Sequence, residues 1–151
     1  MTGMAKTTFT ATARWSGEGL YCQGQARGFQ VALDEPPDLG GTDKAMNPVE
    51  LLLCSLGGCM SICAAAFAPA CHVELKGFRV DLEGDLDPDG FLGKSRDVRK
   101  GYQQIRFRIH IDSPSPEHNI KQLLDLIEER CPVSDTLKGV EVVRQVLGDD
   151  K

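Results

Sequence analysis

The chain has 151 residues, of which 41% are hydrophobic, which is enough for one domain with a real core and too few for two comfortable ones. Its 17 basic and 22 acidic residues give a formal net charge of −5, which offers no positive surface for nucleic acid or an anionic membrane. We therefore expect a single domain over residues 1–151, without a nucleic-acid or membrane partner.

The first third of the chain predicts strands followed by a helix. Strand-like pieces at 7–15 and 29–33, separated by glycine-rich turns, indicate an antiparallel meander, and a loop with paired prolines and glycines follows at 34–46. Asn47, Pro48 and Glu50 then supply an N-cap, a proline at the first helical position and a glutamate at the third. A helix is expected to begin here.

The segment 51–70 contains no charged residue and is about as long as a membrane-spanning helix. Its glycines, serines and cysteines, the proline near its end and the lack of flanking basic or aromatic anchors favour a soluble core helix instead. Because this helix is apolar on every face, we expect it to be surrounded by protein.

The second half predicts two further strands, a helix and a closing strand. Alternation indicates strands at 72–86 and 104–111, joined by a polar connection at 85–101, and a last strand at 140–146. The residues expected to point inward are Ile105, Phe107, Ile109 and Ile111 in the second of these strands, and Ile120, Leu123, Leu124 and Ile127 in the helix before Cys131. The order β-β-α-β-β-α-β is an α+β pattern.

Six cysteines in a short chain can indicate a secreted, disulfide-bonded domain. The first eight residues, Met-Thr-Gly-Met-Ala-Lys-Thr-Thr, contain no apolar signal segment. We therefore expect a reducing, cytoplasmic location.

The local sequence predicts a reactive thiol more strongly at Cys131 than at Cys59. It precedes Pro132, which can only begin a new helix, so its thiol is expected near a helix N-terminus, where backbone N–H groups favour a thiolate. A space-filling role at this corner is an equal alternative.

Cys59 lies in mid-helix among Leu, Met and Ala, where a cysteine is most often a small hydrophobe. Cys63 falls one turn later on nearly the same face, so the two could form a pair or supply two metal ligands, with His72 as a third. The spacing lacks the paired Cys-x2-4-Cys motif of structural zinc sites, so we expect no metal.

The run Asn47-Pro-Val-Glu-Leu-Leu-Leu-Cys-Ser-Leu-Gly-Gly-Cys59, followed by Cys131-Pro-Val-Ser134, resembles the OsmC/Ohr family (osmotically inducible protein C and organic hydroperoxide resistance protein). The resemblance in motif order extends from about Thr8 to Val146. It implies an OsmC-like fold, with antiparallel sheets wrapped around buried central helices in an intertwined homodimer.

The same resemblance implies a thiol peroxidase that reduces organic hydroperoxides in oxidative stress defence. Cys59 is then the peroxidatic cysteine and Cys131 the resolving one, with no bound cofactor and with a small or lipoyl-type dithiol as the external reductant. No role is implied for Cys22, and Cys54, Cys63 and Cys71 become structural by default.

The chain departs from the family pattern at the groups that activate the cysteine. Strong peroxidases of the family carry a glutamate directly after Asn-Pro and an arginine in the first hairpin, but here the first position is Val49 and the turn at 15–19 has no arginine. Arg14, Arg27 and Glu50 are the remaining candidates, although Glu50 lies roughly 13 Å along the helix from Cys59 and nearly opposite to it.

These departures place the chain nearer to the OsmC-like branch of unassigned substrate. Two alternatives to the peroxidase therefore stay open. One is an OsmC-fold protein that binds a small molecule and has weak or lost peroxidase activity, and the other is a metal-thiolate protein.

Overall fold

The computed structural model defines residues 3 and 5–145 and forms two compact units, Met1–Leu51 and Leu52–Lys151. The boundary falls in the first turn of the long helix α1 (Pro48–Phe67). The expectation of one domain over the whole chain stays a prediction.

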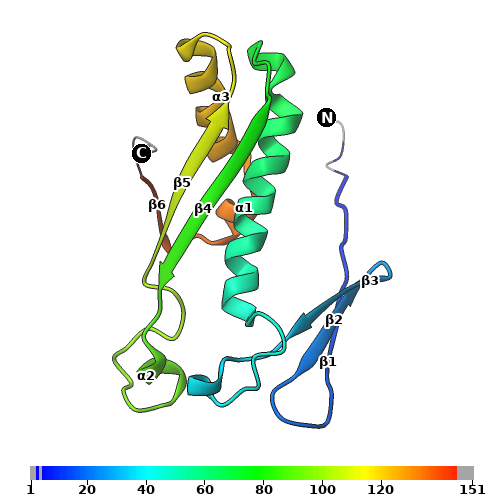
Figure 1. Ribbon diagram of the computed structural model, residues 1–151, viewed down its shortest axis with the longest axis vertical. Coiled ribbons are helices and arrows are strands. Elements are labelled where there is room, and N and C mark those ends of the chain that lie inside the picture. The colour runs from blue at the N-terminus through cyan, green and yellow to red at the C-terminus, as the bar shows by residue number, and fades with distance from the viewer. Residues whose placement is uncertain (1–2, 4, 146–151) are drawn as a thin grey trace. The chain divides into compact units, whose positions relative to one another are not determined.

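The first unit contains an antiparallel meander, as predicted, but with three strands (Figure 1). Its strands are β1 (Thr12–Trp15), β2 (Cys22–Ala26) and β3 (Phe29–Leu33), paired in the order β1-β2-β3. Strand β2 was expected to be a turn region, because its sequence Cys-Gln-Gly-Gln-Ala is poor in β-branched and aromatic residues. Pairing with a neighbour on each side overrides that weak local preference.

The loop after β3, which includes the 3-10 helix η1 (Pro37–Leu39), is organised by the buried carboxylate of Asp34. The Thr42 hydroxyl donates to Asp34 Oδ2 at 2.6 Å, the Lys44 N–H donates to the same oxygen at 3.2 Å, and the Glu35 N–H donates to Oδ1 at 2.8 Å. These bonds, the one from Thr42 first among them, lower the pKa of Asp34 to about 2.

The ionisation of Asp34 is expected to make the free energy of unfolding depend on pH in the acid range. Its pKa in the folded protein is below its usual value of 3.8, so its contribution is complete above about pH 4 and is lost as the pH falls toward about 2. Asp34→Asn should melt at a lower temperature than the wild type at pH 7 and show a flatter decline between pH 4 and 2. Melts followed by circular dichroism across this range test this, with the exposed Asp38→Asn as the control. Parallel pH profiles for wild type and Asp34→Asn would contradict it.

Helix α1 begins where the sequence predicts, with a complete capping box. The Glu50 N–H donates to Asn47 Oδ1 at 2.8 Å, and the Asn47 N–H donates to Glu50 Oε1 at 3.0 Å. The Asn47 side-chain amide also donates to Glu35 at 3.1 Å. The carboxylate of Glu50 therefore has a local structural role.

The described residues of the second unit bury one face of α1. The buried residues of the helix are Leu56, Gly57, Met60, Cys63 and Ala64. Ile62, by contrast, is 71% exposed. The described residues of the second unit therefore do not by themselves surround this helix, as was expected, because its apolar side chains are distributed all round and these residues bury one side. Its 20 residues and mean hydropathy of 1.8 would also suit a membrane span, a test that the core helix of a soluble protein passes equally.

The second unit is built on a sheet of β4 (Gly77–Asp85), β5 (Gln104–Asp112) and β6 (Glu141–Arg144), in that order. β4 and β5 are antiparallel, but β5 and β6 are parallel. The expectation of purely antiparallel sheets is therefore wrong at β6. The intervening helices return the chain across the sheet before β6 begins, as a parallel pair requires. Val146, the predicted end of this strand, lies outside the described residues.

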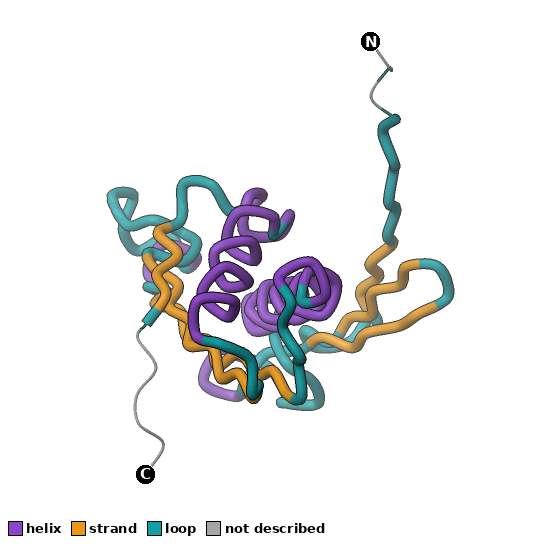
Figure 2. The backbone as a smooth tube through the Cα atoms, turned by 90° about the horizontal axis from the view of Figure 1, so that it is seen from above, coloured by secondary structure: helices purple, strands orange, loops and turns teal. Residues whose placement is uncertain are grey.

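Helices α1 and α3 (Glu117–Arg130) cover one face of this sheet (Figure 2). The short helix α4 (Pro132–Thr136) follows α3. The predicted inward residues are confirmed, since Ile105, Phe107, Ile109, Leu123 and Ile127 are all at most 3% exposed, with Ile111, Ile120 and Leu124 half-buried. The 3-10 helix η2 (Pro69–Cys71) ends α1, and a short helix α2 (Pro88–Phe91) interrupts the polar connection.

Gly57 sets how closely α1 approaches the sheet. A Cβ atom at this position would lie 2.7 Å from Cδ1 of Leu82 on β4. The absence of a side chain therefore lets the helix backbone lie against the strand, two residues before Cys59.

Candidate active site

The fold brings together three thiols of the second unit. Cys59 lies in the middle of α1, Cys63 one turn later, and Cys131 between α3 and α4. Cys59 is among the groups that raise the pKa of the thiols of both Cys63 and Cys131, so the three side chains lie near one another. Cys63 is 8% and Cys131 2% exposed, Cys59 is half-buried, and all three are free thiols. We call these three residues the thiol cluster.

Cys131 occupies the predicted place at the start of a helix. It is the N-cap of α4, and its Sγ accepts a hydrogen bond from the Ser134 N–H at 3.4 Å. Burial nevertheless raises the pKa of the Cys131 thiol to about 11, against the lowering effect of this hydrogen bond and with further increases from Cys59 and Cys63. The N–H of Ser134 at the helix start does favour the thiolate, as predicted, but burial outweighs it. A five-residue helix cannot offset the loss of solvation.

Cys63 is held in its protonated form by the same influences. Burial first, then the negative charge of Cys59 and a hydrogen bond with it, raise the pKa of the Cys63 thiol. Cys59 therefore contributes to the raised pKa of both neighbouring thiols, and Cys63 contributes to that of Cys131 as well.

The candidate activating residues all belong to the first unit. Arg14 is on β1, and Arg27 is at the β2–β3 turn with its guanidinium carbon 5.3 Å from the centre of the Phe29 ring. Glu50 caps α1. Among the described groups that act on the thiols of Cys63 and Cys131 there is no charged residue other than cysteine. A role for Arg14, Arg27 or Glu50 in activation stays a prediction.

The other cysteines are dispersed. Cys71 is buried in η2, Cys54 is exposed on α1, and Cys22 lies on β2 of the first unit. His72, the possible third metal ligand, follows η2 in a left-handed conformation. Within residues 3 and 5–145, no group of three or more His, Cys, Asp or Glu side chains is arranged to hold a metal ion. The metal-thiolate alternative therefore finds no support in this part of the chain.

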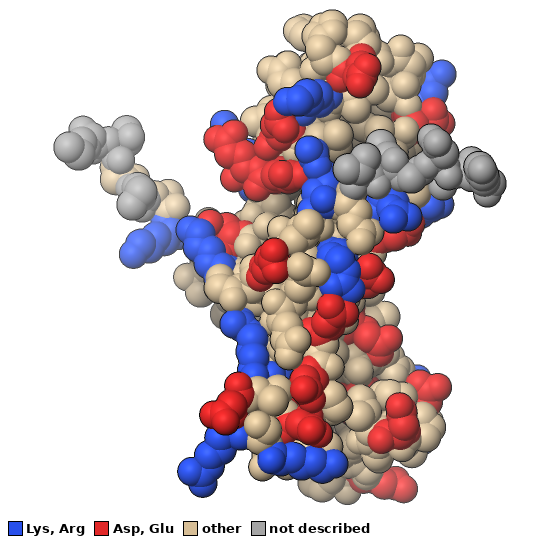
Figure 3. All heavy atoms as spheres, turned by 90° about the vertical axis from the view of Figure 1, so that its left-hand side faces the viewer, with Lys and Arg blue, Asp and Glu red and all other residues tan. Residues whose placement is uncertain are grey.

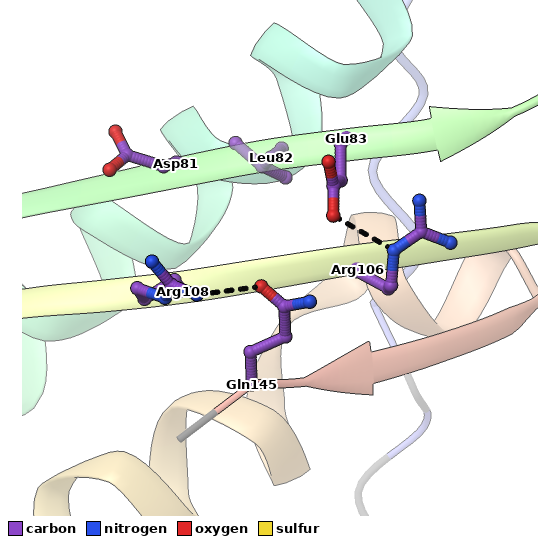
Figure 4. Close-up of a pocket in the computed structure, with 6 residues that line it drawn as sticks. All are labelled: Asp81, Leu82, Glu83, Arg106, Arg108 and Gln145. Carbon is purple, nitrogen blue, oxygen red and sulfur yellow. Dashed lines mark hydrogen bonds and ion pairs between the residues drawn. The ribbon is translucent and has the colours of Figure 1, made fainter. Parts of the chain in front are cut away.

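The strands β4 and β5 also carry a charged hollow of about 180 Å³, which the sequence analysis did not identify (Figure 4). Arg106 donates to Glu83 at 2.9 Å and to Asp85 at 2.6 Å, and Arg108 donates to Gln145 at 3.3 Å. The sequence feature that could have predicted this hollow is the alternation of charged with apolar residues along β4 and β5. Ligand pockets usually have volumes of about 300–1,000 Å³, so this hollow is small for one. Acidic and basic side chains are interspersed over the face shown in Figure 3.

Comparison with known proteins assigns this chain to a family. The model of the OsmC-like protein family matches residues 41–144. The chain is 29% identical over 119 residues to a hydroperoxide reductase of Mycoplasma pneumoniae, covering 77% of each chain. It is 30% identical over 111 residues to a hydroperoxide reductase of Mycoplasma genitalium, covering 74% of each.

Solved structures show the same fold. An OsmC-like protein from Mycoplasma pneumoniae superposes with a TM-score of 0.81 at 24% identity, over 95% of this chain and 98% of that one. An OsmC-like protein of unknown function from Vibrio cholerae superposes with a TM-score of 0.78 at 12% identity, over 94% and 100% of the two chains. The α+β chain with its two small sheets belongs to the OsmC-like protein family.

Proposed function

We propose that this protein reduces organic hydroperoxides with Cys59 as the peroxidatic and Cys131 as the resolving cysteine. The proposal is supported by the proximity of Cys59 and Cys131, through which Cys59 raises the pKa of the Cys131 thiol, in a family whose curated relatives are named hydroperoxide reductases. Those names support a peroxidase-like enzyme in peroxide detoxification. The assignment of the two cysteines is our own step.

The reaction begins at the half-buried sulfur of Cys59. Its thiolate attacks one oxygen of the peroxide O–O bond, a proton joins the departing oxygen, and an alcohol leaves, so that Cys59 becomes a sulfenic acid. The Cys131 thiol then displaces the hydroxyl of this sulfenic acid, forming the Cys59–Cys131 disulfide and releasing water.

An external dithiol, small or lipoyl-type, completes the cycle. It attacks the disulfide through a mixed-disulfide intermediate, returns both cysteines to thiols and is itself oxidised to a disulfide. The proposed cycle uses no bound cofactor, and the proposed location is the cytoplasm, where such reductants keep thiols reduced.

The protein is proposed to act as an intertwined homodimer, with a second copy covering the apolar face of α1 that one chain leaves exposed. Ile62 marks this face with 71% of its surface accessible. Apolar side chains on a long helix are stabilised when another protein surface removes them from water.

Ile62→Asp is expected to convert the dimer to a monomer, because the charge would have to be buried without a partner at the interface. Size-exclusion chromatography with light scattering measures the change directly. Phe91→Asp is the matched control, since Phe91 is 81% exposed but lies on α2. A dimer that persists with Asp at position 62 would place the interface elsewhere.

The function itself is tested by counting thiols. Fully reduced protein has six free cysteines, and treatment with an equivalent of cumene hydroperoxide is expected to leave four, because one disulfide removes two. Mass spectrometry of the digest should find Cys59 joined to Cys131. Retention of all six thiols would instead favour the small-molecule binding protein without peroxidase chemistry.

The second chemical step is expected to accelerate with pH. Burial, the largest influence on the pKa of Cys131 at about 11, persists after Cys59 has been oxidised, so the attacking thiolate stays scarce at neutral pH. Disulfide formation should therefore become about tenfold faster per unit between pH 7 and 9. Quenched-flow thiol counting after a single peroxide addition measures this rate, and a pH-independent rate would contradict the expectation.

A further inference from the structure

We propose that Arg108 binds the carboxylate group of a small molecule in the charged hollow of the second unit (Figure 4). The proposed peroxidase cycle uses none of the residues that line this hollow, so the site is additional to the thiol cluster. It is supported by the place of the hollow in the sheet, by the pairing of the charges around it and by an N–H group of Arg108.

The side chain of Arg108 lies on the face of the sheet opposite to the one that α1 and α3 cover. On the covered face, Leu82 of β4 lies against Gly57 of α1, and its register partner Phe107 on β5 is buried. Successive side chains on a strand point to opposite faces, so Arg108 points away from these helices. A molecule bound to Arg108 therefore leaves the thiol cluster unobstructed.

The carboxylates around the hollow already have cationic partners. They are paired as follows: Asp81 with Arg79 at 3.2 Å, and Glu83 and Asp85 with Arg106 at 2.9 and 2.6 Å. The half-buried Arg108 differs from these cations, because its partner among the described residues is the neutral side-chain oxygen of Gln145. Within this part of the chain, the positive charge of Arg108 thus has no carboxylate of its own.

The guanidinium of Arg108 also has an unused donor. Its Nε is buried and has no hydrogen-bond partner among the described residues, which costs free energy, especially for a charged group. The neighbouring Nη2, on the same edge of the guanidinium, donates to Gln145 Oε1 at 3.3 Å. A carboxylate in place of that oxygen would accept from both nitrogens, in the bidentate geometry that makes Arg–carboxylate pairs strong.

The side chain of Gln145 is a replaceable partner for Arg108. Its backbone N–H is fixed by a hydrogen bond of 2.8 Å to the Phe107 carbonyl, so the side chain can rotate away without movement of the strand. Its own bond to Arg108 is long and involves a neutral acceptor, whereas a charged acceptor binds a guanidinium more strongly.

The size and charge of the hollow define the ligand. A volume of about 180 Å³ is small for a whole ligand of the usual size, but it accommodates a carboxylate on a short stem. Asp81 and Glu83 also line the hollow, and their negative charges disfavour a doubly charged anion such as phosphate. The expected ligand is therefore a small monocarboxylate.

The test follows the Nε–H signal of Arg108 by proton–nitrogen NMR while sodium propionate is added to the full-length protein. This signal is identified by its absence from the spectrum of Arg108→Lys. We expect a saturable shift with a Kd of about 1–10 mM, the range open to so small a ligand. Propionamide, which has the same shape without the charge, and sodium chloride at equal ionic strength should give no saturable shift. Inorganic phosphate should bind more weakly than propionate.

Three variants locate the binding, which is then followed through the backbone signals of β5 and β6. Arg108→Gln should weaken propionate binding at least about tenfold, because it removes the charged fork. Gln145→Ala should tighten it about two- to fivefold, because the competing acceptor is gone. Arg144→Gln is the matched control: it removes the same charge from the same sheet, but Arg144 pairs with Glu128 of α3 at 3.1 Å. Its Kd should stay within about twofold of the wild type, since salt screens the more distant charge.

Several results would overturn the proposal: a shift that chloride or propionamide reproduces, tighter binding of phosphate, undiminished binding by Arg108→Gln, weaker binding by Gln145→Ala, or an equal loss in Arg144→Gln. Propionate binding requires neither a thiol nor a hydroperoxide. Its outcome is therefore separate from that of the thiol count that tests the proposed function.

Discussion

Replacement of Cys59 by serine is expected to abolish the reaction with organic hydroperoxides, lowering its rate by about a thousandfold or more. The physical reason is that a serine hydroxyl does not ionise near neutral pH, whereas the proposed attack on the O–O bond requires an anionic sulfur. Loss of cumene hydroperoxide over time, with a dithiol in excess, is the measurement. Cys54→Ser provides the control, since Cys54 is an exposed cysteine of the same helix and should leave the rate unchanged.

The matching variant of the second cysteine separates the two chemical steps. Cys131→Ser should still consume one equivalent of peroxide but should stop at the Cys59 sulfenic acid, which dimedone then traps and mass spectrometry detects. If Cys59→Ser still lost two thiols on oxidation, the attacking residue would be another cysteine and our assignment would fail.

Leu123→Ala is expected to lower the free energy of unfolding by about 2–5 kcal/mol. Leu123 has no exposed surface and lies with Ile127 on the side of α3 that is buried in the second unit. Truncation removes apolar contacts and leaves a cavity that the surrounding sheet and helices can fill only in part. Urea unfolding at one fixed protein concentration measures the loss.

A leucine in a different environment provides the comparison. Leu92, which follows α2, is 54% exposed, and Leu92→Ala should change the free energy of unfolding by at most about 0.5 kcal/mol. Equal losses for the two variants would mean that the α3 stripe does not form the core described above.

The secondary structure was predictable where a local pattern is strong. Asn47 and Glu50 predict the start of α1, because the capping box that they form joins residues only three apart in the sequence. The alternation along β5 and the 3.6-residue stripe of α3 equally reflect short-range periodicity. Strand β2 escaped prediction because its own residues have little preference for a strand and its partners on both sides decide the outcome.

The sequence by itself therefore determined the α+β class, the main helices and strands, and a resemblance that singles out Cys59 and Cys131. The tertiary structure decided the parallel pairing of β6, which face of α1 is buried in the second unit, and the addition of Cys63 to the cluster. It also decided the pKa of Cys131, because the helix start that lowers this pKa is visible in the sequence while the burial that outweighs it is not. The physical reason is that capping and periodicity depend on neighbours along the chain, whereas desolvation and thiol–thiol contacts depend on groups that only folding brings together.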